Sequence, residues 1–457
     1  MSMSRDVRFW EIRPNKSSKR KKTYEVRWKV GGRERSRTFE TKALAKNFLL
    51  DLQMAAKRGE EFEIKSGLPE SMIQAKEAVS WLGFVQAYIA SRWPHAAAKT
   101  RDSMTDALAT VTPVLVTDAA GMPEAETVRT ALRQYALLPA DRRPADPSPE
   151  IVEAVRWLEK VSLPLAALAQ TATVHAALDA LALKMDGNPA AAETYRRKRA
   201  VFYNVLQYAA ELEELPANPL DRIKSQWRRP KVVETVDRRV VVNPRQAKEL
   251  LTAVSYVGRR RGRPMVALFA CMYYAGLRPG EAVALRKQDC HLPATGWGTL
   301  TLETSRPQTG KRWTDSGEAH DKRGLKQRAD KETREVPIPP ELVRILLDHI
   351  AEFGVAEDGR LFRSQRGNVV SSSSYYRVWR EARLLALTPE QVASPLAGKP
   401  YDLRHAALSL WLNAGVHAPE VAQRAGHTVD VLLQRYAKCL DGDREIANGR
   451  ISRALGS

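Results

Sequence analysis

The pattern of apolar and polar residues near the start of the chain predicts a small β-sheet. Between Tyr24 and Val30 every second side chain is apolar, which is the period of a half-buried strand. Gly31-Gly32 then predicts a tight hairpin turn. On the returning strand, Arg33, Arg35 and Arg37 fall on one face.

A helix is expected beside this sheet, because the apolar side chains change to helical spacing from Lys42 to about Lys57. A preceding run, from Val7 to Arg13, fits a third strand. We therefore expect residues 1–70 to form a small module of a β-sheet and a helix.

The next part of the chain is rich in Ala and Leu, and residues 75–225 are predicted to form a helical domain. One helix in it, from Thr194 to Leu212, has a basic N-terminal half that includes Arg196 and Arg197. Such a helix suits binding to DNA phosphates. A solvated helix face explains the same charges about as well.

Beyond this domain, a basic linker over residues 224–235 carries Arg228 and Arg229. Residues 236–457 then combine helical segments with short strands such as Gly298–Glu303. The whole pattern predicts a multi-domain chain that is mainly α with small β-sheets, in the α+β class. A length of 457 residues agrees with several domains.

The charge of the chain indicates a polyanionic partner. Lys and Arg exceed Asp and Glu by 20, and the first 50 residues alone hold 15 basic against 5 acidic side chains. Nucleic acid is therefore expected as the partner before a membrane surface, and the three arginines on alternate positions of one strand favour contact with a groove of DNA. The residues predicted to contact it are Arg27, Lys29, Arg33, Arg35, Arg37, Arg196, Arg197, Arg228 and Arg229.

Composition argues against several other classes of protein. Cys271, Cys290 and Cys439 lie far apart, so neither a disulfide framework nor a zinc site is predicted. No segment reads as a signal peptide or a membrane span, and we expect a cytoplasmic, nucleoid-associated protein. We expect no metal ion and no other cofactor.

Four short motifs in the second half of the chain carry the candidate chemistry. They are Gly276-Leu-Arg278-Pro-Gly-Glu281, Tyr401-Asp-Leu-Arg404-His405, Gly426-His427 and Tyr436. In this order and at these spacings they resemble the catalytic domain of tyrosine recombinases of the phage-integrase type, over about residues 235–440. On periodicity alone, Tyr436 would instead be a core aromatic on an apolar helical stripe.

The resemblance implies a site-specific DNA recombinase, an integrase that cuts and rejoins strands through a covalent 3′-phosphotyrosine intermediate without metal. It implies an arm-binding module over residues 1–70, a core-binding domain over 75–225 and a catalytic domain over 236–457. It further implies a homotetramer in the synaptic complex, and it leaves open an accessory directionality factor.

The resemblance also assigns roles that suit the residue types. Tyr436 would be the nucleophile, and a tyrosyl ester can store the energy of the phosphodiester bond. Arg278 and Arg404 would hold both non-bridging oxygens through their planar guanidinium groups. His427 would hydrogen-bond the phosphate or share in moving the phenolic proton, and a lysine would protonate the departing 5′-oxygen.

Two positions depart from the family pattern or leave a choice. The family motif H-x-x-R begins here with Tyr401, whose phenol is a poor general base near neutral pH, so we expect an assisting role. The family lysine precedes a strand of the type Arg334-Glu-Val-Pro337. Lys326 fits this place best, and Lys331 is the alternative.

Three other functions compete with the recombinase. A catalytically inactive integrase-like protein that binds DNA or regulates would keep the basic segments, and the tyrosine at position 401 gives it some weight. A metal-dependent transposase or nuclease would need clustered acidic ligands, and no convincing acidic triad is present. A type IB topoisomerase shares the tyrosine chemistry but would not need an arm-binding module.

Overall fold

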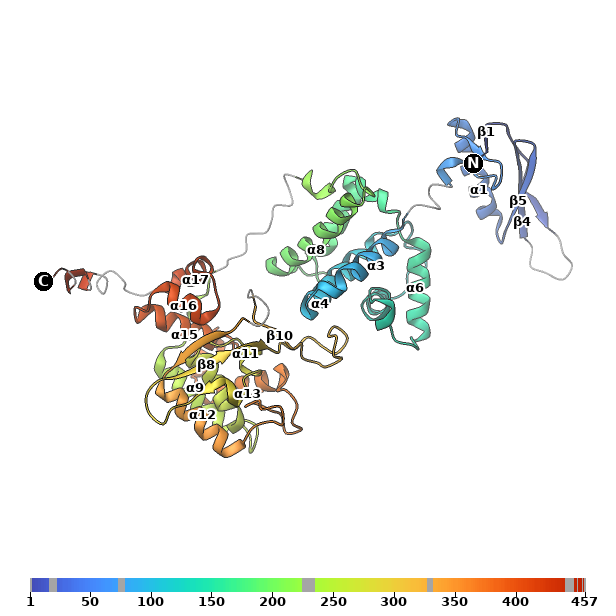
Figure 1. Cartoon of the computed structure of the whole chain (residues 1–457). Helices are drawn as coiled ribbons and strands as arrows, with labels where there is room; N and C mark the ends of the chain where they lie inside the picture. The colour runs from blue at the N-terminus through green and yellow to red at the C-terminus, as the bar shows by residue number, and fades with distance from the viewer. Residues whose placement is uncertain are drawn as a thin grey trace. The chain divides into compact units, whose positions relative to one another are not determined.

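The computed structural model describes residues 2–15, 23–72, 79–223, 235–326, 332–439, 448–449, 451–453 and 455. The chain divides into two compact units, Met1–His95 with Ser103–Pro230, and Ala96–Asp102 with Lys231–Ser457 (Figure 1). The predicted basic linker with Arg228 and Arg229, and the alternative lysine Lys331, lie outside the described residues.

The N-terminal module is an antiparallel sheet beside one long helix, as the sequence predicts. Its strands and helix are β1 (Met3–Ser4), β2 (Val7–Phe9), β3 (Arg13–Asn15), β4 (Thr23–Val30), β5 (Arg33–Phe39), α1 (Lys42–Lys57) and β6 (Phe62–Glu63). β4 is central: β2 and β3 pair with one of its edges and β5 with the other. The side chain of Thr41 caps α1 by accepting a hydrogen bond from Leu44 N.

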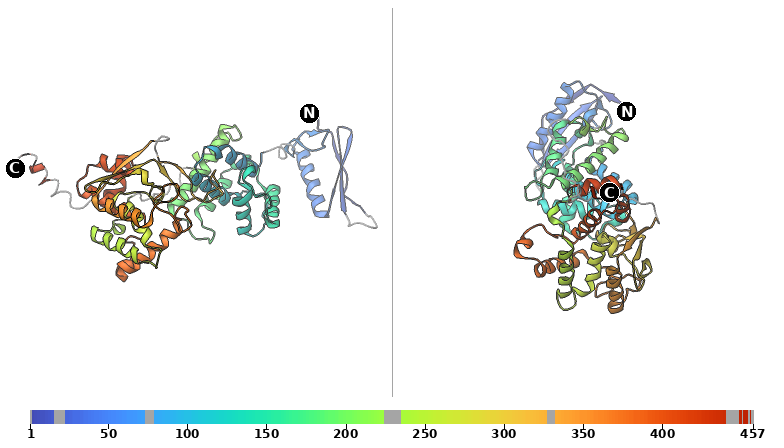
Figure 2. Two further views of the ribbon diagram at one scale, coloured as in Figure 1. Left: turned by 60° about the horizontal axis from the view of Figure 1, so that its bottom comes forward. Right: turned by 90° about the vertical axis from the view of Figure 1, so that its left-hand side faces the viewer.

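The segment that follows is helical, in agreement with its composition. Its helices are α3 (Trp81–Arg92), α4 (Ala98–Val111), α5 (Ala125–Ala131), α6 (Pro149–Val161), α7 (Thr171–Ala182) and α8 (Ala192–Glu211). Both views in Figure 2 show this group of helices. The buried rings of Trp81 and Phe202 pack edge to face with centroids 5.9 Å apart, and they join α3 to α8.

The second unit surrounds a small sheet with helices. Its elements are α9 (Pro244–Tyr256), α10 (Val266–Tyr274), α11 (Pro279–Ala282), β7 (Cys290–His291), β8 (Gly298–Leu302), β9 (Thr304–Ser305), β10 (Arg323–Gly324), β11 (Arg334–Ile338), α12 (Pro340–Phe353), α13 (Ser372–Ala386), α14 (Pro389–Ala393), α15 (Asp402–Asn413), α16 (Ala418–Ala425) and α17 (Val429–Tyr436). The sheet order is β11-β8-β7, all antiparallel.

Two hydrophobic clusters organise this unit. The larger one is centred on α10, whose residues from Ala267 to Tyr273 are all buried. The smaller one joins α15, α16 and α17 and includes Leu432 and Tyr436. Figure 1 shows α16 and α17 grouped at one end of the unit, while α9, α12 and α13 lie around β8. The helices described here include none that is both long and apolar enough to cross a bilayer.

Candidate active site

Two glycines bring the candidate motifs of the sequence together in space. Gly276 has a φ of +59°, and a Cβ there would lie 2.9 Å from Leu408 Cδ1. Gly426 caps α16 in the left-handed conformation, where a Cβ would collide with the guanidinium of Arg334. Because neither position has a side chain, the backbone carbonyls of both turns reach the buried arginines.

Arg404 is fully buried on α15 and binds both turns. One of its Nη atoms donates to the carbonyl of Gly276, and the other donates to the carbonyl of Ala425 at 2.6 Å. Arg278 precedes α11 and donates through Nη2 to the carbonyl of Gly426 at 2.8 Å. The two arginines that the sequence singles out therefore converge on the same pair of turns.

A buried carboxylate, Glu281, holds three guanidinium groups in place. It accepts from Arg278 Nη1 at 2.7 Å and from both Nη atoms of Arg334 at 3.1 and 2.7 Å, and Arg404 Nη1 lies 3.9 Å away. Burial alone raises the pKa of a carboxyl, but the charges of Arg334, Arg278 and Arg404 outweigh it here and lower the pKa of Glu281 to about 2. The carboxylate is therefore ionised at neutral pH.

This arrangement leaves an excess of positive charge in a buried place. Arg278, Arg334 and Arg404 bring three positive charges and Glu281 one negative charge, so 3 − 1 = +2. A phosphodiester carries one negative charge, and attack by a phenolate adds a second one. The site thus has the charge that a phosphoryl-transfer transition state needs.

The imidazole of His427 is held in one tautomer. Its Nε2 lies 3.1 Å from Arg404 Nη2, and a guanidinium can only donate, so Nε2 must accept. Burial and the charges of Arg404 and Arg278 lower the pKa of His427 to about 3, which keeps the ring neutral. The single ring proton is therefore on Nδ1, and His427 presents an N–H donor.

Several buried donors of this site have no acceptor among the described residues. They are Nδ1 of His427, Nε of Arg404 and Nε of Arg334. An unsatisfied buried donor costs about 1–3 kcal/mol, so proteins keep such groups for a reason. Anionic oxygens would satisfy them, which makes this cluster a candidate site for a phosphate group.

Tyr436 lies at the end of α17 with 1% of its surface exposed. Its hydroxyl is hydrogen-bonded to Nδ1 of His405 at 2.8 Å. Burial raises the pKa of Tyr436 above its ordinary value of 10.0, although the nearby charge of Arg404 acts in the opposite direction. The phenol is thus part of the core, as its periodicity predicts, and at the same time it lies beside the arginine cluster.

The two remaining candidates are Tyr401, which contacts a residue of the site, and Lys326, which takes no part in the contacts of the arginine cluster given above. The ring of Tyr401 packs edge to face on His405, with centroids 5.0 Å apart, so it neighbours the Tyr436 hydroxyl. Lys326 is exposed at the end of the short β9–β10 ladder, next to residues that the structure does not describe. None of the hydrogen bonds and ion pairs of the arginine cluster given above involves Lys326.

The arginines of β5 do share one face, but it is the face that α1 covers. Strand register places Arg35 opposite the buried Trp28 and Arg37 opposite the buried Val26. Arg35 donates to the carbonyl of Ile64 at 2.8 Å, and Arg37 lies over the rings of Phe39 and Phe48. These two side chains therefore close the edge of the module's core.

Arg33 also lies on the α1 face, because it is opposite the buried Val30, whereas two other predicted basic residues lie on the opposite face of this sheet. Arg27 and Lys29 point there, because the alternate residues of β4 are buried against α1. Register adds Arg8 opposite Lys29. Arg33 is exposed at the start of β5. In the helical segment, Arg197 is exposed on α8, while Arg196 pairs with Glu193 at 2.9 Å.

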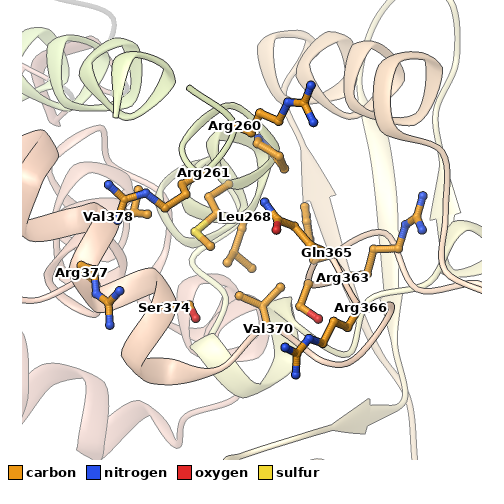
Figure 3. Close-up of a pocket in the computed structure, with 14 residues that line it drawn as sticks. Arg260, Arg261, Leu268, Arg363, Gln365, Arg366, Val370, Ser374, Arg377 and Val378 are labelled. Atoms are coloured by element: carbon orange, nitrogen blue, oxygen red, sulfur yellow. The ribbon is translucent and has the colours of Figure 1, made fainter. Parts of the chain in front are cut away.

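A separate basic cavity of about 340 Å³ lies in the second unit. Its wall is apolar at Leu268, Val370 and Val378, and Figure 3 shows arginine side chains from three segments around it. None of its lining residues is a predicted catalytic residue. In the part of the chain that is described, no group of three or more His, Cys, Asp and Glu side chains is placed to hold a metal ion.

Three residues of the site were not among the sequence candidates: Glu281, Arg334 and His405. The sequence does indicate that Arg334 is buried, because it alternates with the apolar Val336 and Ile338 on the buried face of β11. The sequence also indicates that His405 lies near Tyr401, since it follows that residue by four positions and so shares its helix face. The role of Glu281 as a common partner depends on contacts 53 and more residues away, which spacing does not reveal.

Comparison with known proteins finds similar sequences. The family model "Phage integrase family" matches residues 241–442. A putative prophage phiRv2 integrase of Mycobacterium tuberculosis is 30% identical over 124 residues, which are 26% of this chain and 31% of that protein. The match thus spans less than a third of the relative's length. The segment that resembles the family, residues 241–442, lies in the second unit and contains all four candidate motifs.

One solved structure with a similar fold matches most of the chain at low sequence identity. A lambda integrase dimer bound to a COC′ core site has a TM-score of 0.50 and 12% identity, with 90% of this chain and 92% of that chain covered. The Tn1549 transposon integrase in complex with a circular intermediate DNA has a TM-score of 0.48 and 15% identity, covering 72% of this chain and 99% of that chain. The fold class predicted from the sequence, mainly α with small β-sheets, is confirmed.

The buried histidines and Glu281 make stability depend on pH. Burial and the charge of Arg404 lower the pKa of His405 from 6.5 to about 4. The unfolded chain therefore binds a proton at this position from about pH 6.5 downward, and the folded protein does not until about pH 4. Stability is lost as the pH falls through this window, by up to about 1.4 kcal/mol per pH unit for one such group.

We expect the urea midpoint of the full chain to fall between pH 7 and pH 5. It should fall further towards pH 3, because the unfolded chain takes up a proton at Glu281 below about pH 4.5, whereas the lowered pKa of about 2 keeps this carboxylate ionised in the folded protein. In His405→Asn the fall between pH 7 and pH 5 should be shallower than in the wild type. Equal slopes in the two proteins would contradict the assignment of a neutral buried imidazole at position 405.

Proposed function

We propose that this protein is a site-specific DNA recombinase that cuts and rejoins strands through a covalent 3′-phosphotyrosine intermediate at Tyr436, without a metal ion. The convergence of Arg278, Arg404 and His427 beside Tyr436 is the observation that carries the proposal. The family match over residues 241–442 supports it independently. DNA complexes of the similar integrases support double-stranded DNA as the substrate.

In this proposal the phosphate enters the buried donor site. Arg278 and Arg404 bind its non-bridging oxygens, and Nδ1 of His427 donates to the same group. Glu281 does not touch the substrate; together with the Nη atoms of Arg334 it keeps the two arginines in place, and Nε of Arg334 is left as a further donor to the phosphate. Because the hydroxyl of Tyr436 is buried, we infer that the segments covering it rearrange when DNA binds, so that phosphorus reaches the phenol while its contact with His405 is kept.

A nicked suicide substrate tests the function. The full chain is incubated in EDTA with duplex DNA carrying its site and a nick just beyond the cleavage position, so that the short fragment bearing the new free 5′-hydroxyl diffuses away. We expect a covalent protein–DNA adduct in the wild type and none in Tyr436→Phe. Cleavage that needs magnesium and leaves no adduct would indicate a nuclease, and binding without cleavage would indicate an inactive regulatory protein.

Lys326 is proposed as the general acid for the departing 5′-oxygen. Lys326→Ala should lower cleavage of ordinary DNA by about 100- to 10,000-fold, because an alkoxide leaves poorly without a proton. A substrate with a bridging 5′-sulfur needs little protonation and should restore the rate selectively in Lys326→Ala. If the sulfur substrate rescues Lys331→Ala instead, the acid is Lys331.

The N-terminal module is proposed to bind arm-type DNA through the face of its sheet away from α1. Arg27→Ala and Lys29→Ala should each weaken binding and reduce the salt dependence of the association constant by about one unit of slope. Arg37→Ala serves as the control, because that side chain covers Phe39 and Phe48. A larger loss of salt dependence in Arg37→Ala than in Arg27→Ala would indicate that DNA binds the face covered by α1, which would contradict the proposal.

The helical segment over residues 75–225 is proposed as the core-binding domain, with the exposed Arg197 of α8 among its phosphate contacts. A complete reaction exchanges two duplexes, so we propose four protomers in the synaptic complex. An accessory directionality factor remains compatible with this scheme.

A further inference from the structure

The hydroxyl of Tyr436 is hydrogen-bonded to His405, whereas His427 binds Arg404 instead. Nδ1 of His405 lies 2.8 Å from Tyr436 Oη, and the two ring centroids are 5.7 Å apart. Nε2 of His427 lies 3.1 Å from Arg404 Nη2. The two imidazoles of the site therefore have different partners, and the one at position 405 touches the proposed nucleophile.

The place of the His405 side chain in the site follows from the geometry of α15. Residues four apart on a helix share a face, and the rings of Tyr401 and His405 stack edge to face along it. Arg404 is the adjacent residue on the same helix and binds the two glycine turns. The helix thus presents the phosphate-binding arginine and the partner of the phenol side by side.

The phenolic proton needs an acceptor, because burial keeps Tyr436 protonated at neutral pH. The charged and titratable groups acting on Tyr436 and His405 are Arg404 and Tyr401 from α15 and its first turn, and Arg435 and Cys439 from α17 and beyond. Arginines have no lone pair to offer at this pH, and a neutral phenol or thiol is a poor base. Among the described groups here, only the imidazole of His405 combines contact with a lone pair.

We propose that His405 is the general base for Tyr436. Its Nδ1 takes the phenolic proton as Tyr436 Oη bonds to phosphorus, with the ring's own proton on Nε2. The bond between phosphorus and the 5′-oxygen breaks, and that oxygen takes a proton from the general acid. In the reverse reaction His405 returns its proton to the tyrosine. This inference rests on the proposed recombinase function.

The electrostatics of the site favour this transfer only when DNA is bound. In the free protein, burial and the charges of Arg404 and Arg435 hold the pKa of His405 at about 4. An incoming phosphate brings negative charge to the same arginine and weakens its effect on the imidazole. His405 therefore becomes a better base when the substrate is in place.

A tyrosine analogue of lower pKa separates this role from a structural one. Full-length protein is made with His405→Asn, which keeps a polar side chain beside the hydroxyl but cannot take a proton. With the nicked substrate at pH 7, we expect adduct formation to be about 100- to 10,000-fold slower than in the wild type. Fluorinated tyrosine at position 436 ionises more readily and should restore most of that rate.

His427→Asn is the matched control, since its imidazole is proposed to donate to the phosphate and not to accept the phenolic proton. Fluorotyrosine should not rescue it.

In His405→Asn the rate should also rise about tenfold per pH unit, as expected when solvent removes the proton. The urea midpoints of His405→Asn and His427→Asn show whether the fold is kept. His405→Gln repeats the test with a second polar side chain that cannot take a proton.

Wild-type rates in His405→Asn, or equal rescue of both histidine variants by fluorotyrosine, would overturn the proposal. So would a folded His405→Asn protein that fluorotyrosine does not rescue. Failure of the proposed function gives a different result, because then the wild-type protein itself forms no adduct.

Discussion

Replacing Arg404 by lysine is expected to slow strand cleavage by about 100- to 1,000-fold, the usual cost of losing one donor to a developing phosphate charge. Arg404 uses its two Nη groups for the carbonyls of Gly276 and Ala425, and its Nε faces no acceptor within the described chain. A lysine keeps the charge but has a single nitrogen, so it cannot hold both turns and the phosphate.

The measurement is single-turnover adduct formation on the nicked substrate with saturating protein. Arg424→Lys is the control, because that arginine lies on α16, pairs with Glu420 and stacks over the ring of Trp411. We expect Arg424→Lys to cleave at the wild-type rate. A wild-type rate in Arg404→Lys would show that the guanidinium at this position does not bind the phosphate.

The second large effect is expected on stability, in Glu281→Gln. Removing one partner of a buried ion pair costs about 3–5 kcal/mol, because the opposite charge is left buried without compensation. Here Glu281, with 1% of its surface exposed, is the carboxylate that Arg278 and Arg334 contact and that Arg404 approaches. Neutralising it leaves three guanidinium groups close together.

Urea unfolding of the full chain, followed by a probe in the second unit such as a tryptophan signal, measures this loss. Glu420→Gln is the matched control: it removes an exposed carboxylate that pairs with Arg424, which is worth at most about 1 kcal/mol. Equal destabilisation by the two substitutions would mean that Glu281 is not the centre of the arginine cluster.

Much of the fold could be predicted from sequence because local periodicity dominates it. The alternation in β4 and the amphipathic α1 both appear where their patterns predict them. The turn before α11 is likewise local, since Gly276 and Pro279 both act on the backbone conformation there. These features depend on neighbours within a few residues.

What sequence could not predict depends on register and on long-range contacts. Arg35 and Arg37 share a face, as alternation requires, but only pairing with β4 shows that this face lies against α1. Likewise, the hydroxyl of Tyr436 finds His405 across 31 residues. The apolar spacing around Tyr436 predicts its burial, whereas the resemblance predicts its chemistry.

The most direct test of the central claim is to identify the amino acid that becomes linked to DNA. The adduct formed in EDTA is digested with protease and nuclease, and the nucleotide-bearing peptide is sequenced by mass spectrometry. The account predicts a single modified peptide with the nucleotide on Tyr436 through its 3′-phosphate. A nucleotide on another residue, or one linked to the protein through its 5′-phosphate, would contradict it.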